Sequence, residues 1–385
     1  MTIGIDGRLW NQTGIGRYVR NLVLNLLNQD KRNEYVLFVI EKDEEDIKNQ
    51  ISKLEIKNLK LKIVSVNVSW HSFSEQVRFP KILNKEKLNL MHFPYFNVPI
   101  FYKGPYVITV HDLVYHHFMT GKASTLPIWL YGFKMLAYRI VIGTAARKAK
   151  KIIAVSNSTK REIMNHLRVD GDKVDIVYEA ADDFSAKGSE SSGRKSDNEL
   201  DIKNYFLYVG NIYPHKNTER LLEAFKIFSK ENDTKLIFVG KEDYFYKNLK
   251  KGSRKMIEEG KIIIIYDAPD KKLYTLYKNA ICLVRPSLME GFSLPPLEAL
   301  SCRCLVLASK ISVHKEIFGD SIIYFDPYNT RDIIDKMGYV YGLDKKTRDG
   351  YIERGISLTW NFSWEKTARQ TLKVYEDSIG IRQNK

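Results

Sequence analysis

The sequence predicts an α/β protein built of two doubly wound domains, each with a parallel sheet between helices. Three observations support this prediction. Short apolar runs recur without in-out alternation, which is typical of strands buried on both faces of a sheet. Segments with helical spacing separate these runs, as crossover connections require. One polar stretch divides the pattern in two, and 385 residues suffice for two domains.

The first half, residues 1–184, alternates strands and helices from its start. We expect a strand at 2–5 and a helix at 17–27, where apolar residues recur at helical spacing. Further strands are expected at 35–40, 62–66, 89–93, 106–110, 152–155 and 174–177. We therefore assign residues 1–184 to an N-terminal domain.

Residues 185–204 interrupt the pattern. They are rich in Ser, Gly and Lys and nearly free of large apolar side chains. This composition predicts an interdomain linker, although a long surface loop would occupy the same place.

The second half, residues 205–362, restarts the same pattern as a C-terminal domain. Strands are expected at 205–209, 235–239, 261–266, 280–284, 305–308 and 322–325, and helices at 218–229, 270–279 and 294–301. A final helix at 363–377, capped by Ser363, is expected to pack with the rest of 363–385 on the N-terminal domain. Ligands of open α/β sheets bind beyond the carboxyl ends of the strands, so we expect the site in a cleft between the domains.

The charge balance favours anionic partners. The 61 basic and 46 acidic residues leave a formal net charge of +15. Nucleic acid, an anionic membrane and a phosphate-bearing substrate all fit this surplus, and so does a Lys-rich background without function.

The remaining composition indicates a cytoplasmic protein. Its three cysteines, Cys282, Cys302 and Cys304, are expected to be reduced thiols, and the first residues do not resemble a signal peptide. The most apolar stretch, 126–146, carries Lys134 and Arg139. It is therefore interpreted as a buried helix, with an interfacial helix as the alternative. Peripheral contact with the inner face of the plasma membrane would use that alternative and the basic cluster at 147–151.

Two loops are suited to phosphate. Gly14 and Gly16 lie between the first strand and its helix, where small residues let backbone N–H groups approach an anion at a helix N-terminus. Asn211 and Lys216 follow the strand at 205–209 and precede a helix, which places a cation for a pyrophosphate. A tight turn and a solvated lysine, respectively, explain these loops without a ligand.

Two further elements are suited to a sugar. Glu290 and Glu298 are eight residues apart around a Gly turn and a Pro-Pro helix start, and carboxylates accept hydrogen bonds from sugar hydroxyls. His111 ends the strand at 106–110 and can donate to a substrate oxygen, although a His beside an Asp often satisfies itself within its loop.

Together these four elements resemble the retaining glycosyltransferases of family 4, over nearly the whole chain and including the segment 362–366. The Glu-x7-Glu element is the most specific mark. The resemblance implies the GT-B fold, in which two Rossmann-like, doubly wound domains face each other across a cleft. It also implies that the N-terminal domain receives the acceptor and the C-terminal domain binds the nucleotide sugar.

The same resemblance implies roles for the site residues. Glu290 and His111 would be catalytic beside the transferred sugar, Glu298 would bind the ribose, and Lys216 and Gly16 would meet the diphosphate. Family members usually have Arg where this chain has Asn211, and Arg285 is a candidate to compensate. The complete set expected to bind the nucleotide sugar is Gly14, Gly16, Asn211, Lys216, Glu290, Gly291, Phe292, Ser293, Leu294 and Glu298.

The beginning of the chain, DGR at 6–8 and GIGRY at 14–18, is similar to bacterial mannosyltransferases that build surface polysaccharides from GDP-mannose. We therefore expect a hexose, mannose from GDP-mannose, to be moved with retention onto a glycan or lipid-linked glycan. UDP-sugars remain an alternative donor. No Asp-x-Asp motif occurs outside the polar loop at 170–172, so we expect no metal cofactor.

Two other classes of protein share parts of this pattern. A sugar-nucleotide epimerase or phosphorylase has the same fold, and fold does not determine function. A non-catalytic nucleotide- or nucleic-acid-binding protein would explain the positive charge. No nucleic-acid module is recognisable in the sequence, so we expect no nucleic-acid partner.

Overall fold

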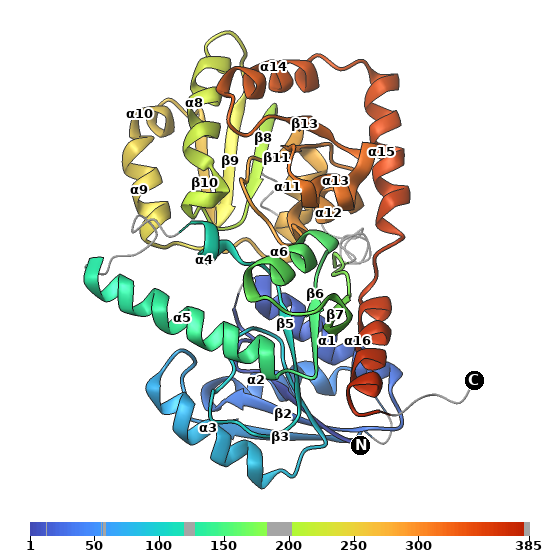
Figure 1. The fold of residues 1–385 in the computed structure, drawn as a ribbon. Helices are drawn as coiled ribbons and strands as arrows, with labels where there is room; N and C mark the ends of the chain where they lie inside the picture. The colour runs from blue at the N-terminus through green and yellow to red at the C-terminus, as the bar shows by residue number, and fades with distance from the viewer. Residues whose placement is uncertain (13, 55, 57–58, 119–127, 183–201, 381–385) are drawn as a thin grey trace. The chain divides into compact units, whose positions relative to one another are not determined.

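The computed structural model describes residues 1–12, 14–54, 56, 59–118, 128–182 and 202–380. The chain forms two compact units, one of Met1–Glu179 with Ser363–Lys385 and one of Ala180–Phe362. Each unit is a parallel sheet flanked by helices (Figure 1), which confirms the predicted fold class. Most of the predicted linker, 185–204, lies outside the described residues.

The N-terminal unit contains a seven-stranded sheet in the order β3-β2-β1-β4-β5-β6-β7, with every pair parallel. Its strands are β1 (Thr2–Asp6), β2 (Glu34–Ile40), β3 (Leu61–Val66), β4 (Leu90–Phe93), β5 (Tyr106–Val110), β6 (Lys151–Ala154) and β7 (Val174–Ile176). The strand order reverses beside β1, which creates a topological switch point at the carboxyl ends of β1 and β4. β4 and β5 are buried along their whole length, as their unbroken apolar sequences predict.

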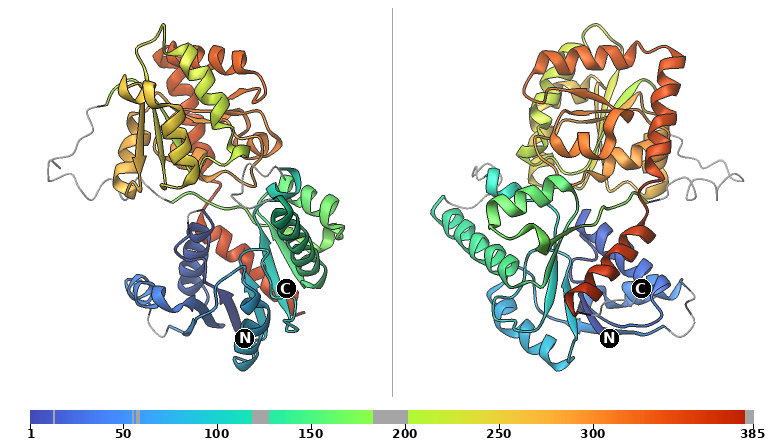
Figure 2. Two further views of the ribbon diagram at one scale, coloured as in Figure 1. Left: turned by 90° about the vertical axis from the view of Figure 1, so that its left-hand side faces the viewer. Right: turned by 45° about the vertical axis from the view of Figure 1, so that its right-hand side comes forward.

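Helices connect these strands, and the last helix of the chain returns to this unit. They are α1 (Gly14–Gln29), η1 (Glu41–Asp43), α2 (Glu44–Ser52), α3 (Phe73–Lys85), α4 (Val114–His117), α5 (Ile128–Lys148), α6 (Asn157–Leu167), η3 (Gly171–Lys173) and α16 (Trp364–Ser378). α16 lies beside α1 (Figures 1 and 2). The Tyr375 hydroxyl of α16 bonds His92 Nδ1 of β4 at 2.7 Å. Ser363 accepts a hydrogen bond from Lys366 N, so it is the expected N-cap.

The C-terminal unit repeats this arrangement with six parallel strands in the order β10-β9-β8-β11-β12-β13. The strands are β8 (Tyr205–Val209), β9 (Lys235–Gly240), β10 (Ile262–Tyr266), β11 (Cys282–Arg285), β12 (Val306–Ser309) and β13 (Ile323–Phe325). The helices are η4 (Pro214–Lys216), α8 (Thr218–Phe228), α9 (Tyr244–Gly252), α10 (Arg254–Glu258), α11 (Asp270–Asn279), α12 (Leu294–Ser301), α13 (Ser312–Phe318), η5 (Gly319–Ser321), α14 (Thr330–Tyr341) and α15 (Lys345–Thr359). The order reverses between β8 and β11. The three cysteines are buried and free.

Helix α1 begins earlier than its apolar pattern predicts. Gly14 and Gly16 were expected in a loop, but the structure places both in the first turn of the helix. A Cβ atom on Gly16 would clash with the carbonyl oxygen of Trp10 and lie 2.8 Å from that of Leu9, whereas one on Gly14 would have no neighbour within 4 Å. Close packing on the preceding loop therefore explains Gly16, and glycine's low helix propensity concealed this turn in the sequence.

The stretch 126–146 was predicted to be a buried helix. This prediction is wrong for most of residues 132–140 of α5. Phe133, Leu136 and Ile140 are 68%, 56% and 51% exposed, while Ile142 and Ala146 further along are buried. Figure 1 shows the reason, because the beginning of α5 extends away from the sheet. Among the described helices, none is both long and apolar enough to cross a membrane.

Candidate functional site

A buried charge cluster lies in the C-terminal unit at the carboxyl ends of β8 and β11, the neighbours at its switch point. Glu290 accepts three side-chain donors there. Lys216 Nζ lies 2.8 Å from Oε2, Ser287 Oγ lies 2.6 Å from Oε1, and Arg285 Nη2 lies 2.6 Å from Oε1. The sequence predicted Lys216 and Glu290 as site residues, and the structure brings them into direct contact.

The cluster holds two cations and one anion, so it carries a net positive charge. The side chains of Arg285, Lys216 and Glu290 are only 6%, 12% and 7% exposed. Burial alone would raise the pKa of the Glu290 carboxyl, but the charges of Arg285 and Lys216 outweigh burial and hold it well below its usual range. Glu290 is therefore ionised at neutral pH, and one positive charge remains for an anionic ligand.

The backbone at the end of β8 makes room for Arg285. Gly210 has a φ of +125°, and a Cβ atom there would lie 3.2 Å from Arg285 Nη1. That same nitrogen donates to Val209 O at 2.9 Å. The Arg285 guanidinium, from β11, thus reaches Val209 at the end of β8. Val209 lies two residues before Asn211, the position at which the family resemblance leads us to expect Arg.

Hydrogen bonds join the loop at 215–217 to the loop at 286–288 and position Lys216. Asn217 adopts a left-handed conformation (φ +57°), which Asn tolerates better than most residues, and its side chain donates to Pro286 O at 3.1 Å. Leu288 N donates to His215 O at 2.8 Å. Burial, together with the charge of Lys216, lowers the pKa of His215 to about 3. His215 is therefore neutral and adds no charge to the cluster.

Asn211 presents an unusual polar atom. Its Oδ1 is buried and accepts no hydrogen bond from the described residues. Its backbone carbonyl accepts from the Tyr208 hydroxyl at 2.5 Å, which orients the residue. Because an unpaired buried acceptor costs about 1–3 kcal/mol, Oδ1 is suited to receive a donor from a ligand.

The loop that follows Glu290 is built around a strained residue. Ser293 precedes α12 with a φ of +82°, uncommon for a residue with a side chain, and its Oγ lies 3.2 Å from His314 Nε2. Burial lowers the pKa of His314 to about 4, so this histidine is neutral. Gly291 and Phe292 are buried, the latter with its ring 5.6 Å from that of Phe362, and Leu294 begins α12.

Glu298 is buried within the C-terminal unit. It is 2% exposed and accepts a hydrogen bond at 2.8 Å from the hydroxyl of Tyr277 on α11. This hydrogen bond joins α12 to α11, and the ribose-binding role of Glu298 stays a prediction. Tyr277 precedes Glu298 by 21 residues, and no local pattern marks the pair.

In the N-terminal unit, His111 follows β5 and uses both ring nitrogens. Nδ1 lies 2.7 Å from Glu179 Oε1, and Nε2 lies 2.9 Å from Pro94 O. Burial lowers the pKa of His111, but the hydrogen bond and charge of Glu179 outweigh it and raise the pKa above its ordinary value. An imidazolium satisfies both acceptors. Glu179 is 68 residues away, so sequence reasoning missed it.

A second polar network in this unit starts from the DGR segment. Arg8 bonds Asp6 at 2.7 Å and Glu75 at 2.6 Å, and Asn97 donates to Glu75 at 2.6 Å. Arg8 and Glu75 are 4% and 0% exposed, so the network is internal. A small hollow beside it is also lined by Trp70 and Tyr95.

Comparison with known proteins identifies the family. Residues 191–357 match the model described as glycosyl transferases group 1, and residues 12–183 match that of glycosyltransferase family 4. The chain belongs to the family 4 glycosyltransferases. Among the relatives of this family 4 glycosyltransferase, O-antigen chain mannosyltransferase B of Escherichia coli is 30% identical over 236 residues, which cover 59% of this chain and 61% of the relative.

A second relative, O-antigen chain mannosyltransferase RfbU of Salmonella typhimurium, is 28% identical over 49% of this chain and 50% of its own. The chain thus spans between half and two thirds of the length of these two curated relatives. Its structure is similar to sucrose-phosphate synthase from Thermosynechococcus elongatus (TM-score 0.76, 15% identity, covering 99% of this chain and 100% of that one). It is also similar to Anabaena HepE in complex with UDP-glucose (TM-score 0.72, 12% identity, covering 98% and 100%). These likenesses show that the chain has the GT-B fold.

Proposed function

We propose that this protein is a retaining glycosyltransferase that moves mannose from GDP-mannose onto a glycan or lipid-linked glycan in surface polysaccharide synthesis. The observation that carries the proposal is the buried, net-positive cluster of Lys216, Arg285 and Glu290 at the switch point of the C-terminal sheet. Ligands of open α/β sheets bind at this point. Buried cations there suit the diphosphate of a sugar nucleotide.

The two cations have different tasks in this proposal. The Lys216 ammonium bonds Glu290 on a flexible aliphatic stem, and in this proposal it turns to the diphosphate when the donor binds. Arg285 is held more firmly, because it bonds both Glu290 and the backbone of β8. Together they offset the negative charge that develops on the leaving nucleoside diphosphate.

Glu290 is proposed to position the cations and the sugar and not to act as a nucleophile. Its Oε1 accepts from Arg285 and Ser287, whereas its Oε2 accepts only from Lys216 among the described residues. Oε2 therefore retains capacity to accept a sugar hydroxyl. Two adjacent cations and a low pKa make this carboxylate a weak nucleophile.

The proposed chemistry is attack from the face that the diphosphate leaves. The bond from the anomeric carbon to the diphosphate oxygen breaks, and a bond to the acceptor oxygen forms on the same face. The acceptor proton passes to the departing diphosphate oxygen. His111 is proposed to contact the transferred sugar, for which its Nε2 proton would exchange Pro94 O for a sugar oxygen.

The choice of donor rests on the relatives. Mannosyltransferases of O-antigen synthesis support mannose, while the UDP-glucose complex of HepE keeps a UDP-sugar as the second candidate. Titration calorimetry with GDP-mannose, GDP, UDP-glucose and UDP separates these donors. Binding of GDP compounds, weakened in Lys216→Ala, supports the proposal, and preference for UDP compounds would replace the donor. Salt-sensitive RNA binding without nucleotide binding would favour a nucleic-acid-binding protein instead.

We also propose that the N-terminal unit contacts an anionic membrane at its cytoplasmic face, where a lipid-linked acceptor resides. Phe133, Leu136 and Ile140 are exposed at helical spacing on α5, and the helix ends in the exposed residues Arg147 and Lys148. Flotation with vesicles containing anionic lipid is expected to recover the wild type, and to recover less of a Phe133→Ser, Leu136→Ser double variant. Recovery that does not depend on anionic lipid would remove the membrane proposal.

A further inference from the structure

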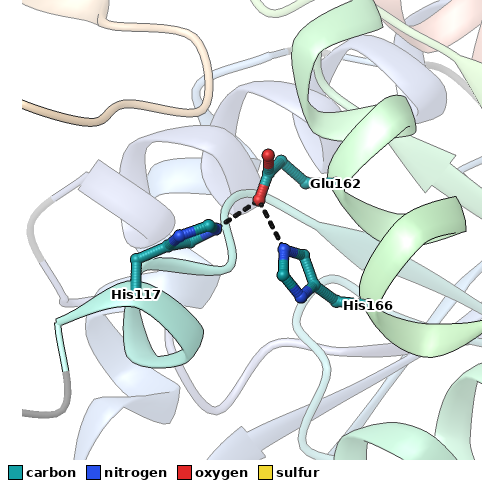
Figure 3. A group of neighbouring side chains, drawn as sticks. All are labelled: His117, Glu162 and His166. Atoms are coloured by element: carbon teal, nitrogen blue, oxygen red, sulfur yellow. Dashed lines mark hydrogen bonds and ion pairs between the residues drawn. The ribbon is translucent and has the colours of Figure 1, made fainter.

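Three side chains outside the proposed transfer site converge in the N-terminal unit. His117 is the last residue of α4, and Glu162 and His166 lie four residues apart on α6, which puts them on one face of that helix. Glu162 Oε2 lies 2.5 Å from His117 Nε2 and 3.3 Å from His166 Nε2. Figure 3 shows both imidazole rings directed at this carboxylate.

We infer that His117, Glu162 and His166 form a binding site for a divalent transition metal ion such as zinc. Imidazole nitrogens and a carboxylate oxygen are ligands that zinc prefers, whereas magnesium and calcium prefer sets of oxygen atoms. The three ligand atoms lie within 4.8 Å of one another. Three protein ligands also leave a coordination position for water.

The two distances to Glu162 are close to those that such an ion requires. Zinc bonds of about 2.0–2.1 Å in a tetrahedron separate the ligand atoms by roughly 3.4 Å. The 3.3 Å between His166 and Glu162 already agrees, and the 2.5 Å to His117 requires that side chain to withdraw by roughly 1 Å. The side chains of His117, Glu162 and His166 are 37%, 30% and 36% exposed, so an ion can enter from solvent.

Neighbouring aromatic residues limit the movement of the rings. The His117 and His166 rings have centroids 4.9 Å apart, and the His116 ring lies 5.4 Å from that of His166. His116 bonds the Tyr138 hydroxyl through Nδ1 at 3.0 Å. Packing of this kind restricts the rotamers of site residues, and here it acts on His166.

A bound ion would join two segments that flank His111. α4 begins three residues after His111, and Thr159 of α6 donates to the His111 carbonyl at 3.3 Å. A metal bridge from His117 to α6 would therefore hold the segment that carries His111. The ion would serve to position this segment, and its binding does not depend on the proposed transfer reaction.

Metal titration of the full chain, without a polyhistidine tag and freed of metal, tests the site. Calorimetry with Zn²⁺ is expected to show one ion per chain and a raised Tm. Co²⁺ is expected to give visible absorption bands typical of a low-coordinate site with nitrogen and oxygen ligands. His117→Gln and His166→Gln are each expected to weaken binding by roughly tenfold or more.

Asn165→Gln is the matched control, because it places the same side chain on an exposed position of the same helix. It is expected to bind metal like the wild type. Absence of binding to the wild type, or equal binding by His117→Gln and His166→Gln, would overturn the inference. A thiolate-to-cobalt charge-transfer band would also overturn it, since it would assign the ion to the cysteines.

Discussion

Arg285 Nη2 lies 2.6 Å from Glu290 Oε1. Arg285 is the last residue of β11, and Glu290 belongs to the loop that follows this strand. Lys216 approaches the other carboxylate oxygen from η4, 74 residues earlier in the chain. Removal of a cation therefore changes the charge available to a ligand, whereas removal of the shared carboxylate also lowers the stability of the unit. These two effects can be measured separately.

Lys216→Ala is expected to lower kcat by about 10²–10³-fold, the loss typical of removing one donor from a developing negative charge. Initial rates with the donor identified by titration measure this effect. Glu290 keeps Arg285 and Ser287 as partners, so Tm should change little. Lys226→Ala, on the exposed face of α8, is the matched control and should retain full activity. An unchanged kcat in Lys216→Ala would contradict the diphosphate role.

Glu290→Gln is expected to destabilise the C-terminal unit by about 3 kcal/mol at neutral pH, because it leaves two buried cations without their anion. The folded-state pKa of Glu290 lies well below its unfolded value of about 4.3. Its stabilising contribution is thus present above that unfolded value and is lost as the pH falls through the folded pKa. Urea unfolding at neutral and acidic pH should show the difference from wild type shrinking in acid.

The exposed substitution Glu223→Gln on α8 is the control for that experiment. It should leave stability unchanged at both pH values. A Glu290→Gln effect that does not decrease in acid would mean that packing, and not charge, accounts for the loss.

His111→Gln is expected to remove a pH-dependent part of the stability of the N-terminal unit. The folded-state pKa of His111 is raised by Glu179 above its unfolded value of about 6.5. The contribution of His111 to the free energy of unfolding is therefore fully present below a pH of about 6.5, and it is lost as the pH rises through the folded-state pKa. Unfolding curves across this range should show wild type and variant converging at alkaline pH. Glu179→Gln should flatten the same dependence, and a flat wild-type profile would be inconsistent with an imidazolium.

Gly16→Ala is expected to cost about 1–3 kcal/mol, because its Cβ would press on the carbonyl oxygens of Trp10 and Leu9. Gly14→Ala is the control, since a Cβ there meets nothing within 4 Å. Thermal unfolding compares the two variants. Equal stability of both would show that the first turn of α1 relaxes more easily than its close packing indicates.

Transfer itself is expected to proceed in the presence of a chelator, since the proposed chemistry uses Lys216 and Arg285 against the diphosphate. The His166→Gln variant is the appropriate background, because it removes the candidate zinc site from consideration. Rates with and without chelator should agree in that variant. Loss of activity on chelation would assign a metal ion to the transfer step.

The sequence alone determined the fold class and much of the strand pattern, because unbroken apolar runs between helical segments are a local property. The helices at 270–279 and 294–301 were predicted with the boundaries that the structure has. Glu290 and Lys216 could also be singled out as candidates, since a Gly turn, a Pro-Pro helix start and a lysine between a strand and a helix each leave a local mark.

Only the tertiary structure decided which of these residues meet. The pairs Lys216–Glu290 and His111–Glu179, and the convergence of His117 with Glu162, join segments between 45 and 74 residues apart. The tertiary structure also buried Glu298 against Tyr277 and left Phe133 exposed on α5. The physical reason is that strand order and helix packing bring these segments together, whereas sequence periodicity specifies only the face of its own element.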